Sequence, residues 1–114
     1  MTLQFTKMNG AGNDFILLDN RARNISLTRE QVVQLCHRQR GIGADGIMLL
    51  VPCTSGKADW AWQFYNSDGS DAEMCGNGAR CFARYIQKLT GVKDRTSFET
   101  VAGVISATFH GERV

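Results

Sequence analysis

The chain has 114 residues, of which 43% are hydrophobic and 21% are charged, and its formal net charge is +2 at pH 7. This length and composition are typical of one small globular domain with a core of its own. A nearly neutral charge, carried by scattered lysines and arginines, gives no electrostatic case for a nucleic acid or a membrane surface as partner. The first residues lack an apolar signal segment, and the longest apolar run, residues 47–51, is too short to span a bilayer. We therefore expect a cytoplasmic protein that acts on a small molecule.

The amino-terminal region predicts a strand that is interrupted by a turn. Residues 4–7 and 15–18 have strand character, and the Gly and Asn residues between positions 9 and 14 tolerate the positive φ angles of turns. Asn13 stands at the exit of this turn. Its carboxamide either bonds its own backbone in an Asx turn, which is the commoner arrangement, or points into a pocket.

A first helix is expected over residues 28–39. Thr28 is a good N-cap residue, and Gln31 three positions later completes a capping box. The apolar stripe of this helix includes Cys36, which we interpret as a small core residue.

The segment GIGADG at residues 41–46 matches the letter pattern G-x-G-x-x-G of dinucleotide-binding loops. That fingerprint requires a strand before the glycines and a helix after them, so that the pyrophosphate meets a helix N-terminus. Here the expected helix comes first and an apolar strand, residues 47–51, follows. The pattern therefore predicts a close-packed connection from helix to strand and no nucleotide site.

Further strands are expected in the second half of the chain. Residues 59–66 alternate so that one face carries aromatic side chains, and the strand ends at Asn66 in a turn of Asn, Ser, Asp and Gly residues. Residues 97–101 and 104–109 predict a hairpin around a Gly-containing turn. Several strands with two helices and no internal repeat indicate an α+β fold.

The most informative stretch is MCGNGARC, residues 74–81, which leads directly into a second, largely apolar helix. Cys75 stands where that helix should begin, and the unpaired N–H groups and positive dipole end of a helix start favour a thiolate. The backbone N–H groups from Gly76 and Asn77 onward form a cradle for a carboxylate or phosphate. Cys81 lies on another face and is expected in the core. A reactive sulfur beside an anion cradle indicates chemistry on a small anionic molecule.

The four cysteines contain no C-x-x-C pair, which argues against a zinc site of the usual type. Two disulfides are an alternative, but a cytosolic setting favours free thiols.

Three motifs, in this order, resemble the amino-terminal half of diaminopimelate epimerase. They are KMNGAGNDF at residues 7–15, GIGADG at residues 41–46, and YNSDGS at residues 65–70 followed by MCGNGARC at residues 74–81. The resemblance implies one of two pseudo-symmetric α+β domains, each a mixed or antiparallel sheet wrapped around a central buried helix, with the active site between them. Residues 1–114 would then be the amino-terminal domain, with the carboxy-terminal domain absent, of a protein that forms a homodimer.

The same resemblance implies a reaction. The family interconverts LL- and meso-2,6-diaminopimelate in bacterial lysine biosynthesis by a two-base proton transfer at the α-carbon, without pyridoxal phosphate or a metal. One cysteine, as a thiolate, removes the α-proton from one face, and a second, as a thiol, supplies a proton from the other. Cys75 would be one of these catalytic bases, and Gly76 and Asn77 would bind the substrate's α-carboxylate through their N–H groups. Asn13 and Asn66 would contact the substrate with their side chains.

Two departures from the family qualify this expectation. Gly46 stands where some members carry a Gln that reaches the substrate, so this position supplies no side-chain contact. The second cysteine would belong to the absent domain, so we expect the 114-residue chain alone to be inactive.

Other functions remain open at this stage. Proline and hydroxyproline racemases resemble this family in their cysteine pair, but their motif usually has His where Asn77 stands. A histidine racemase or another amino-acid racemase is harder to separate. The chain could also be a non-catalytic amino-acid-binding module in which Cys75 is an inert thiol at a helix start.

Overall fold

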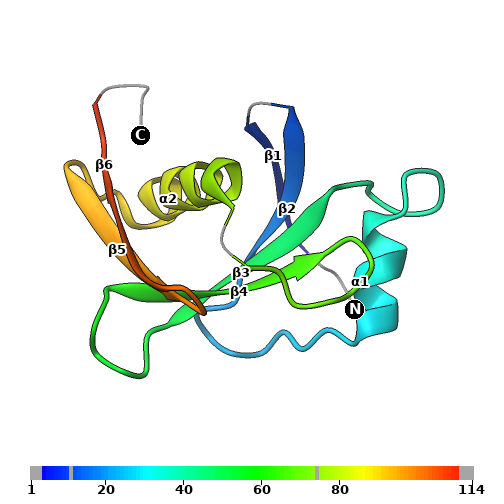
Figure 1. The fold of residues 1–114 in the computed structure, drawn as a ribbon, viewed down its shortest axis with the longest axis horizontal. Coiled ribbons are helices and arrows are strands. Elements are labelled where there is room, and N and C mark those ends of the chain that lie inside the picture. Colours follow the sequence, from blue (N-terminus) through cyan, green and yellow to red (C-terminus); the bar gives the residue numbers. More distant parts are fainter. Residues whose placement is uncertain (1–3, 11, 74, 111–114) are drawn as a thin grey trace.

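The computed structural model describes residues 4–10, 12–73 and 75–110, and within them the chain forms a six-stranded sheet with two helices (Figure 1). The strand order is the chain order, with antiparallel pairs β1–β2, β3–β4 and β5–β6 joined by the parallel pairs β2–β3 and β4–β5. The predicted α+β class with a mixed sheet is confirmed. The elements are β1 (Thr6–Gly10), β2 (Asn13–Asp19), α1 (Arg29–Cys36), β3 (Gly46–Pro52), β4 (Trp60–Asn66), α2 (Gly76–Thr90), β5 (Arg95–Thr100) and β6 (Gly103–Thr108).

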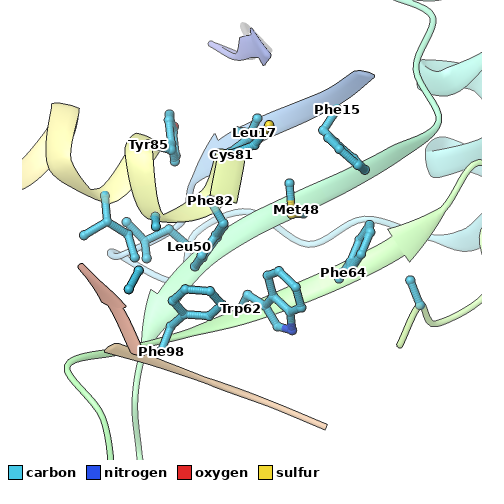
Figure 2. Packing of buried hydrophobic residues seen from close by; sticks show 14 of the residues in the cluster. Phe15, Leu17, Met48, Leu50, Trp62, Phe64, Cys81, Phe82, Tyr85 and Phe98 are labelled. Atoms are coloured by element: carbon cyan, nitrogen blue, oxygen red, sulfur yellow. The ribbon is translucent and has the colours of Figure 1, made fainter. Parts of the chain in front are cut away.

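The sheet curls around α2, which contacts strands from both of its ends (Figure 1). One side of α2 is buried in an aromatic cluster on the inner face of the sheet (Figure 2). The Trp62 ring lies at the centre of this cluster, with its centroid 5.4 Å from that of Phe82 and 5.2 Å from that of Phe98. The prediction of an aromatic face on the β4 segment is confirmed, because Trp62 and Phe64 are buried whereas Gln63 between them is exposed.

The outer face of the sheet is covered by α1 and a smaller apolar cluster. Because strands β2 and β3 are buried on both faces, they are continuous apolar runs and do not alternate. The outer cluster consists of Ile16, Leu18, Val32, Cys36, Ala44, Ile47 and Leu49. Cys36 is thus a core residue, as predicted.

Helix α1 begins as predicted and ends early. Thr28 is its N-cap, and both hydrogen bonds of the capping box with Gln31 are present. The helix stops at Cys36 and does not continue to residue 39, because His37 takes an extended backbone with ψ 125°. The His37 ring then accepts hydrogen bonds from the backbone N–H groups of the next turn. This local bond competes with helix continuation.

The loop after α1 is a close connection between helix and strand, as predicted. The N–H groups of Ile42 and Gly43 both donate to the Leu35 carbonyl, at 2.9 and 3.0 Å. This folds the glycine-rich segment back onto the last turn of α1. In the described part of the chain, neither helix has the length and apolar character that crossing a membrane requires.

The turns of the two hairpins differ from those that the sequence predicts. Strands β1 and β2 extend into the predicted turn and pair as far as Gly10 with Asn13. Residue Ala11 of this turn lies outside the described residues, as do Met74 of the cysteine motif and residues 111–114. In the second hairpin, Gly103 pairs with Thr100. The turn is therefore Val101 and Ala102, one residue earlier than Ala102 and Gly103 as predicted.

Candidate functional site

The start of helix α2 is open. Cys75 is its N-cap, with an extended backbone at φ −127° and ψ 124°. The helical ladder begins with the Ala79 N–H, which donates to the Cys75 carbonyl at 2.8 Å, so the N–H groups of residues 76–78 precede it. Within the described residues, the Cys75 side chain makes no capping hydrogen bond and the first turn carries no acidic residue. The prediction that Cys75 stands at the start of a helix is confirmed.

Burial of α2 holds this start in place. The helix buries the apolar side chains of its middle turns, and it ends at Gly91, whose left-handed φ of 75° lets its N–H donate to the Gln87 carbonyl at 2.9 Å. Near the start, Gly78 is buried, and a Cβ there would lie 3.5 Å from Phe15 Cζ and 3.6 Å from Met48 Sδ. Cys75 itself is half-buried at the margin of the aromatic cluster.

One edge of the sheet faces the start of α2. Parallel strands β2 and β3 begin at this edge, and their antiparallel neighbours end there, so Gly10 pairs with Asn13 and Gly46 pairs with Asn66. A Cβ on Gly10 would lie 3.1 Å from the Asn77 carbonyl oxygen. The end of β1 therefore packs directly against the first turn of α2.

Asn13 connects the sheet edge to α2. Its Oδ1 accepts a hydrogen bond from Asn77 Nδ2 at 2.9 Å, and its Nδ2 donates to Asp45 Oδ2 at 3.3 Å. The carboxamide therefore reaches neighbouring elements and does not bond its own backbone. Of the two arrangements that the sequence allowed, the Asx turn is therefore wrong for Asn13.

Asn66 lies at the same edge, but its side chain bonds a residue of the turn that follows β4. Its Nδ2 donates to Ser70 Oγ at 3.0 Å, and its backbone N–H donates to the Ser70 carbonyl at 2.8 Å. Among the described residues, no hydrogen bond joins Asn66 to Cys75, Asn77 or Asn13. The structure thus brings together Asn13 and the residues that begin α2, and leaves Asn66 exposed beside them.

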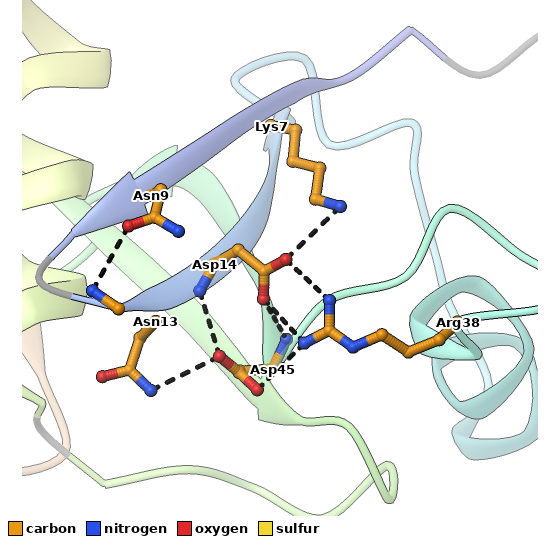
Figure 3. A network of polar contacts seen from close by, with 7 residues as sticks. Lys7, Asn9, Asn13, Asp14, Arg38 and Asp45 are labelled. Atoms are coloured by element: carbon orange, nitrogen blue, oxygen red, sulfur yellow. Dashed lines mark hydrogen bonds and ion pairs between the residues drawn. The ribbon is translucent and has the colours of Figure 1, made fainter.

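A charged network, which the sequence reasoning missed, lies behind Asn13 (Figure 3). Arg38 binds both carboxylate oxygens of Asp14, at 2.7 and 2.9 Å, and also reaches Asp45 at 3.2 Å. Lys7 adds an ion pair to Asp14 at 3.3 Å. The Arg38 guanidinium, with help from Lys7, holds the pKa of the Asp14 carboxyl far below its usual range. Asp14 at the start of β2 and Asp45 directly before β3 were the features of the sequence from which this network could have been predicted.

The four cysteines are free thiols with different surroundings. Burial raises the pKa of Cys36 to about 11. Burial also raises the pKa of Cys81, with Cys75 as a second cause, and Cys81 is a core residue as predicted. Cys53 follows the far end of β3, and a hydrogen bond with Ser55 lowers its pKa.

Position 46 has no room for a side chain. A Cβ on Gly46 would lie 2.8 Å from the Tyr65 carbonyl oxygen and 2.9 Å from Phe64 Cε1, so even alanine would force a shift of the strand. The glycine is therefore required by the approach of β4.

Comparison with known proteins identifies the family. The sequence matches the family model described as diaminopimelate epimerase over residues 5–114. The chain belongs to the diaminopimelate epimerase family. It is 53% identical over 109 residues to a diaminopimelate epimerase of Picosynechococcus sp. (strain PCC 7002), covering 92% of this chain and 38% of that relative. With a diaminopimelate epimerase of Chromobacterium violaceum, the identity is 45% over 114 residues, covering 98% of this chain and 41% of the relative.

The match covers only part of each relative. The chain spans about two fifths of the length of the curated relatives that it matches.

Solved structures of lower sequence similarity share the fold. A hydroxyproline epimerase from Agrobacterium vitis superposes with a TM-score of 0.71 at 14% identity, covering 97% of this chain and 39% of that chain. A methylitaconate-delta-isomerase gives a TM-score of 0.70 at 15% identity, covering 99% of this chain and 62% of that chain. These similarities establish the curled mixed sheet around a helix as a fold that other proteins share.

Proposed function

We propose that this chain is the amino-terminal domain of a diaminopimelate epimerase, which interconverts LL- and meso-2,6-diaminopimelate in bacterial lysine biosynthesis. The observation that carries the proposal is the start of α2, where a half-buried Cys75 adjoins uncapped N–H groups in a chain of this family. Such a biosynthetic enzyme would act in the cytoplasm.

Each group at this site has a proposed task. The N–H groups of Gly76 and Asn77 bind the α-carboxylate of the substrate at the positive end of the helix dipole. Cys75 Sγ removes the α-proton as a thiolate, or returns a proton as a thiol in the reverse direction. Because an α-proton is very weakly acidic, fixed dipoles must stabilise the charge that develops on the carbon and its carboxylate. Asn13 and Asn66 contact the substrate from the sheet edge.

The other half of the reaction requires residues beyond those of this chain. A second cysteine, on the opposite face of the α-carbon, and the groups that recognise the distal end of diaminopimelate belong to a second, pseudo-symmetric domain. The chain's span of about two fifths of its relatives is consistent with this division. The two-cysteine reaction requires no pyridoxal phosphate or metal, and the complete protein is proposed to be a homodimer.

Solvent isotope exchange tests the proposal. The complete gene product is incubated with LL-diaminopimelate in D₂O, and deuterium at the α-carbon and formation of the meso isomer are followed by NMR. We expect both from the complete protein and neither from the 114-residue chain. A complete protein that leaves the α-hydrogen of diaminopimelate unexchanged would refute the function, and enzymatic exchange by the 114-residue chain would refute the division of the site.

The same assay separates the related racemases. Proline, hydroxyproline and histidine serve as alternative substrates under identical conditions. Asn77, where proline racemases usually have His, favours diaminopimelate over the cyclic amino acids. Faster exchange of any alternative substrate would assign the chain to that activity, and tight binding without exchange would indicate a binding module.

A further inference from the structure

Asp45 is the point at which three parts of the candidate site meet. Its backbone N–H donates to the Asp14 carbonyl at 2.9 Å, and its own carbonyl accepts from the Ser67 N–H at 3.1 Å. The residue therefore joins the start of β2, which carries Asn13, to the turn that follows Asn66. None of the roles proposed above uses it.

The Asp45 carboxylate faces Asn13 on one side and Arg38 on the other (Figure 3). Its Oδ2 accepts hydrogen bonds from Asn13 Nδ2 at 3.3 Å and from the Asp14 N–H at 3.0 Å. Its Oδ1 accepts from Arg38 Nη2 at 3.2 Å. Arg38 is itself fixed by its two hydrogen bonds to Asp14.

This arrangement determines which way the Asn13 carboxamide points. An amide presents an oxygen acceptor on one side and an NH₂ donor on the other, and a half-turn exchanges them. An ionised carboxylate only accepts hydrogen bonds, so the NH₂ group of Asn13 must face Asp45. The Asn13 oxygen then faces α2, where it accepts from Asn77 Nδ2 at 2.9 Å.

The orientation of the Asn13 amide also determines that of Asn77, the residue two positions after Cys75. Because Asn13 presents an oxygen to α2, the Asn77 amide must present its NH₂ group in return. Asp45 thereby influences the first turn of α2 through two side-chain amides, those of Asn13 and Asn77. One N–H and one oxygen lone pair of Asn13 remain for a ligand.

We propose that Asp45, held by Arg38, is a positioning residue that sets the orientation of the Asn13 and Asn77 amides for substrate. Its effect on turnover rests on the proposed function, whereas its effect on the amides does not. The inference therefore has one test that requires the reaction and one that does not.

Asp45→Asn is the informative variant because it keeps the shape of the side chain. If its oxygen faces Asn13, its NH₂ group opposes the Arg38 guanidinium; if it is reversed, its NH₂ group opposes the Asn13 NH₂ and the Asp14 N–H. Either orientation loses a hydrogen bond that the carboxylate makes. Asp19→Asn is the control, because Asp19 also pairs with an arginine, Arg21, and lies at the end of β2 opposite to Asn13.

The first test observes the amides directly. In the ¹⁵N-labelled 114-residue chain, the side-chain NH₂ signals of Asn13 and Asn77 are assigned through Asn13→Ala and Asn77→Ala. Asp45→Asn should shift both pairs of signals, and Asp19→Asn should leave them in place. If Asp45→Asn does not fold, Arg38→Gln replaces it and should move the same signals. Unchanged Asn13 and Asn77 signals in a folded variant would overturn the proposal.

The second test is a double-mutant cycle in the complete gene product, with α-proton exchange as the readout. Asp45→Asn and Asn13→Ala should each lower kcat about 10- to 100-fold, as expected for misplaced catalytic groups. If Asp45 acts through Asn13, the double variant should be no slower than Asn13→Ala alone. Multiplying effects would show an independent role and overturn the proposal. A wild-type protein without any exchange would refute the proposed function, and the amide signals would then decide the role of Asp45.

Discussion

The two helices of this chain begin in opposite ways. At the start of α1, Thr28 Oγ1 accepts from the Gln31 N–H at 3.2 Å and Gln31 Oε1 accepts from the Thr28 N–H at 2.8 Å, with Glu30 in the first turn. At the start of α2, Cys75 makes no such bond and no acidic residue follows it in the described turn. The first start satisfies two N–H groups with its own side chains, whereas no side chain among the described residues caps the second.

The difference shows how each helix is stabilised. Helix α1 is short and buries only Val32 and Cys36, so its capping box supplies a substantial share of its local stability. Helix α2 buries six residues of its fifteen and does not depend on a cap. Burial along α2 thus allows its start to remain open for a ligand.

The largest effect on stability should come from the buried side of α2. Phe82 is fully buried between Trp62 and Phe98, so Phe82→Ala should lower the free energy of unfolding by about 3–5 kcal/mol. Val33→Ala, at an exposed apolar position of α1, is the control and should change it by less than about 0.5 kcal/mol. Urea denaturation measures both. Equal losses would contradict the view that burial of α2 dominates.

Thiol reactivity should separate the open helix start from the core. With its pKa raised to about 11, the Cys36 thiol should hold about two orders of magnitude less thiolate at neutral pH than an ordinary cysteine. In the native chain, iodoacetamide should therefore modify Cys75 and Cys53 well before Cys36 and Cys81, as followed by peptide mass spectrometry. If Cys75 reacts no faster than the same thiol in the denatured chain, it is an inert cysteine.

Substitutions at the two N-cap positions should change the stability of the chain. Thr28→Ala removes the capping box and should destabilise the chain by about 1 kcal/mol. At position 75, Ser caps a helix better than Ala does, so Cys75→Ser should be more stable than Cys75→Ala by about 1 kcal/mol. Thermal and urea unfolding of the three variants measure these differences. Equal stability of Cys75→Ser and Cys75→Ala would indicate that the N–H groups of α2 have another partner.

The smallest expected effect is on the loss of folding stability at low pH. Hydrogen bonds from Arg38 and Lys7 lower the folded-state pKa of Asp14 below the usual value of about 3.9, so its ionised form stabilises the fold at neutral pH. That contribution is complete above about pH 4 and is lost as the pH falls toward the lowered pKa. Asp14→Asn should therefore lose less stability than the wild type between pH 5 and pH 2 in urea titrations. Parallel losses would remove Asp14 from the acid response.

Local patterns in the sequence predicted the elements and the position of Cys75. The capping box at Thr28 and the aromatic alternation of β4 each act over a few residues, and each is confirmed. Errors fell at element ends. Helix α1 ends early because His37 bonds the next turn, an effect of side-chain geometry that periodicity does not contain.

The polar part of the site could not be predicted because it depends on register. Asn13 meets Asn77 across 64 positions and Asp45 across 32, and both contacts follow from the way β2, β3 and α2 are packed. The turn pattern in the sequence favoured an Asx turn for Asn13, and only the family resemblance gave it a role at the site. Asp45 was set aside with the glycine-rich loop, although an acidic residue directly before a buried strand was the signal.

The most direct measurement of the central claim compares Cys75→Ser with the wild type in the complete gene product. Solvent deuterium entering the α-carbon of diaminopimelate is followed by NMR, with Cys53→Ser as a control at the opposite end of β3. If Cys75 transfers the α-proton, Cys75→Ser should slow exchange by at least about 100-fold while Cys53→Ser keeps the wild-type rate. Wild-type exchange in Cys75→Ser would contradict the account and remove Cys75 from the mechanism.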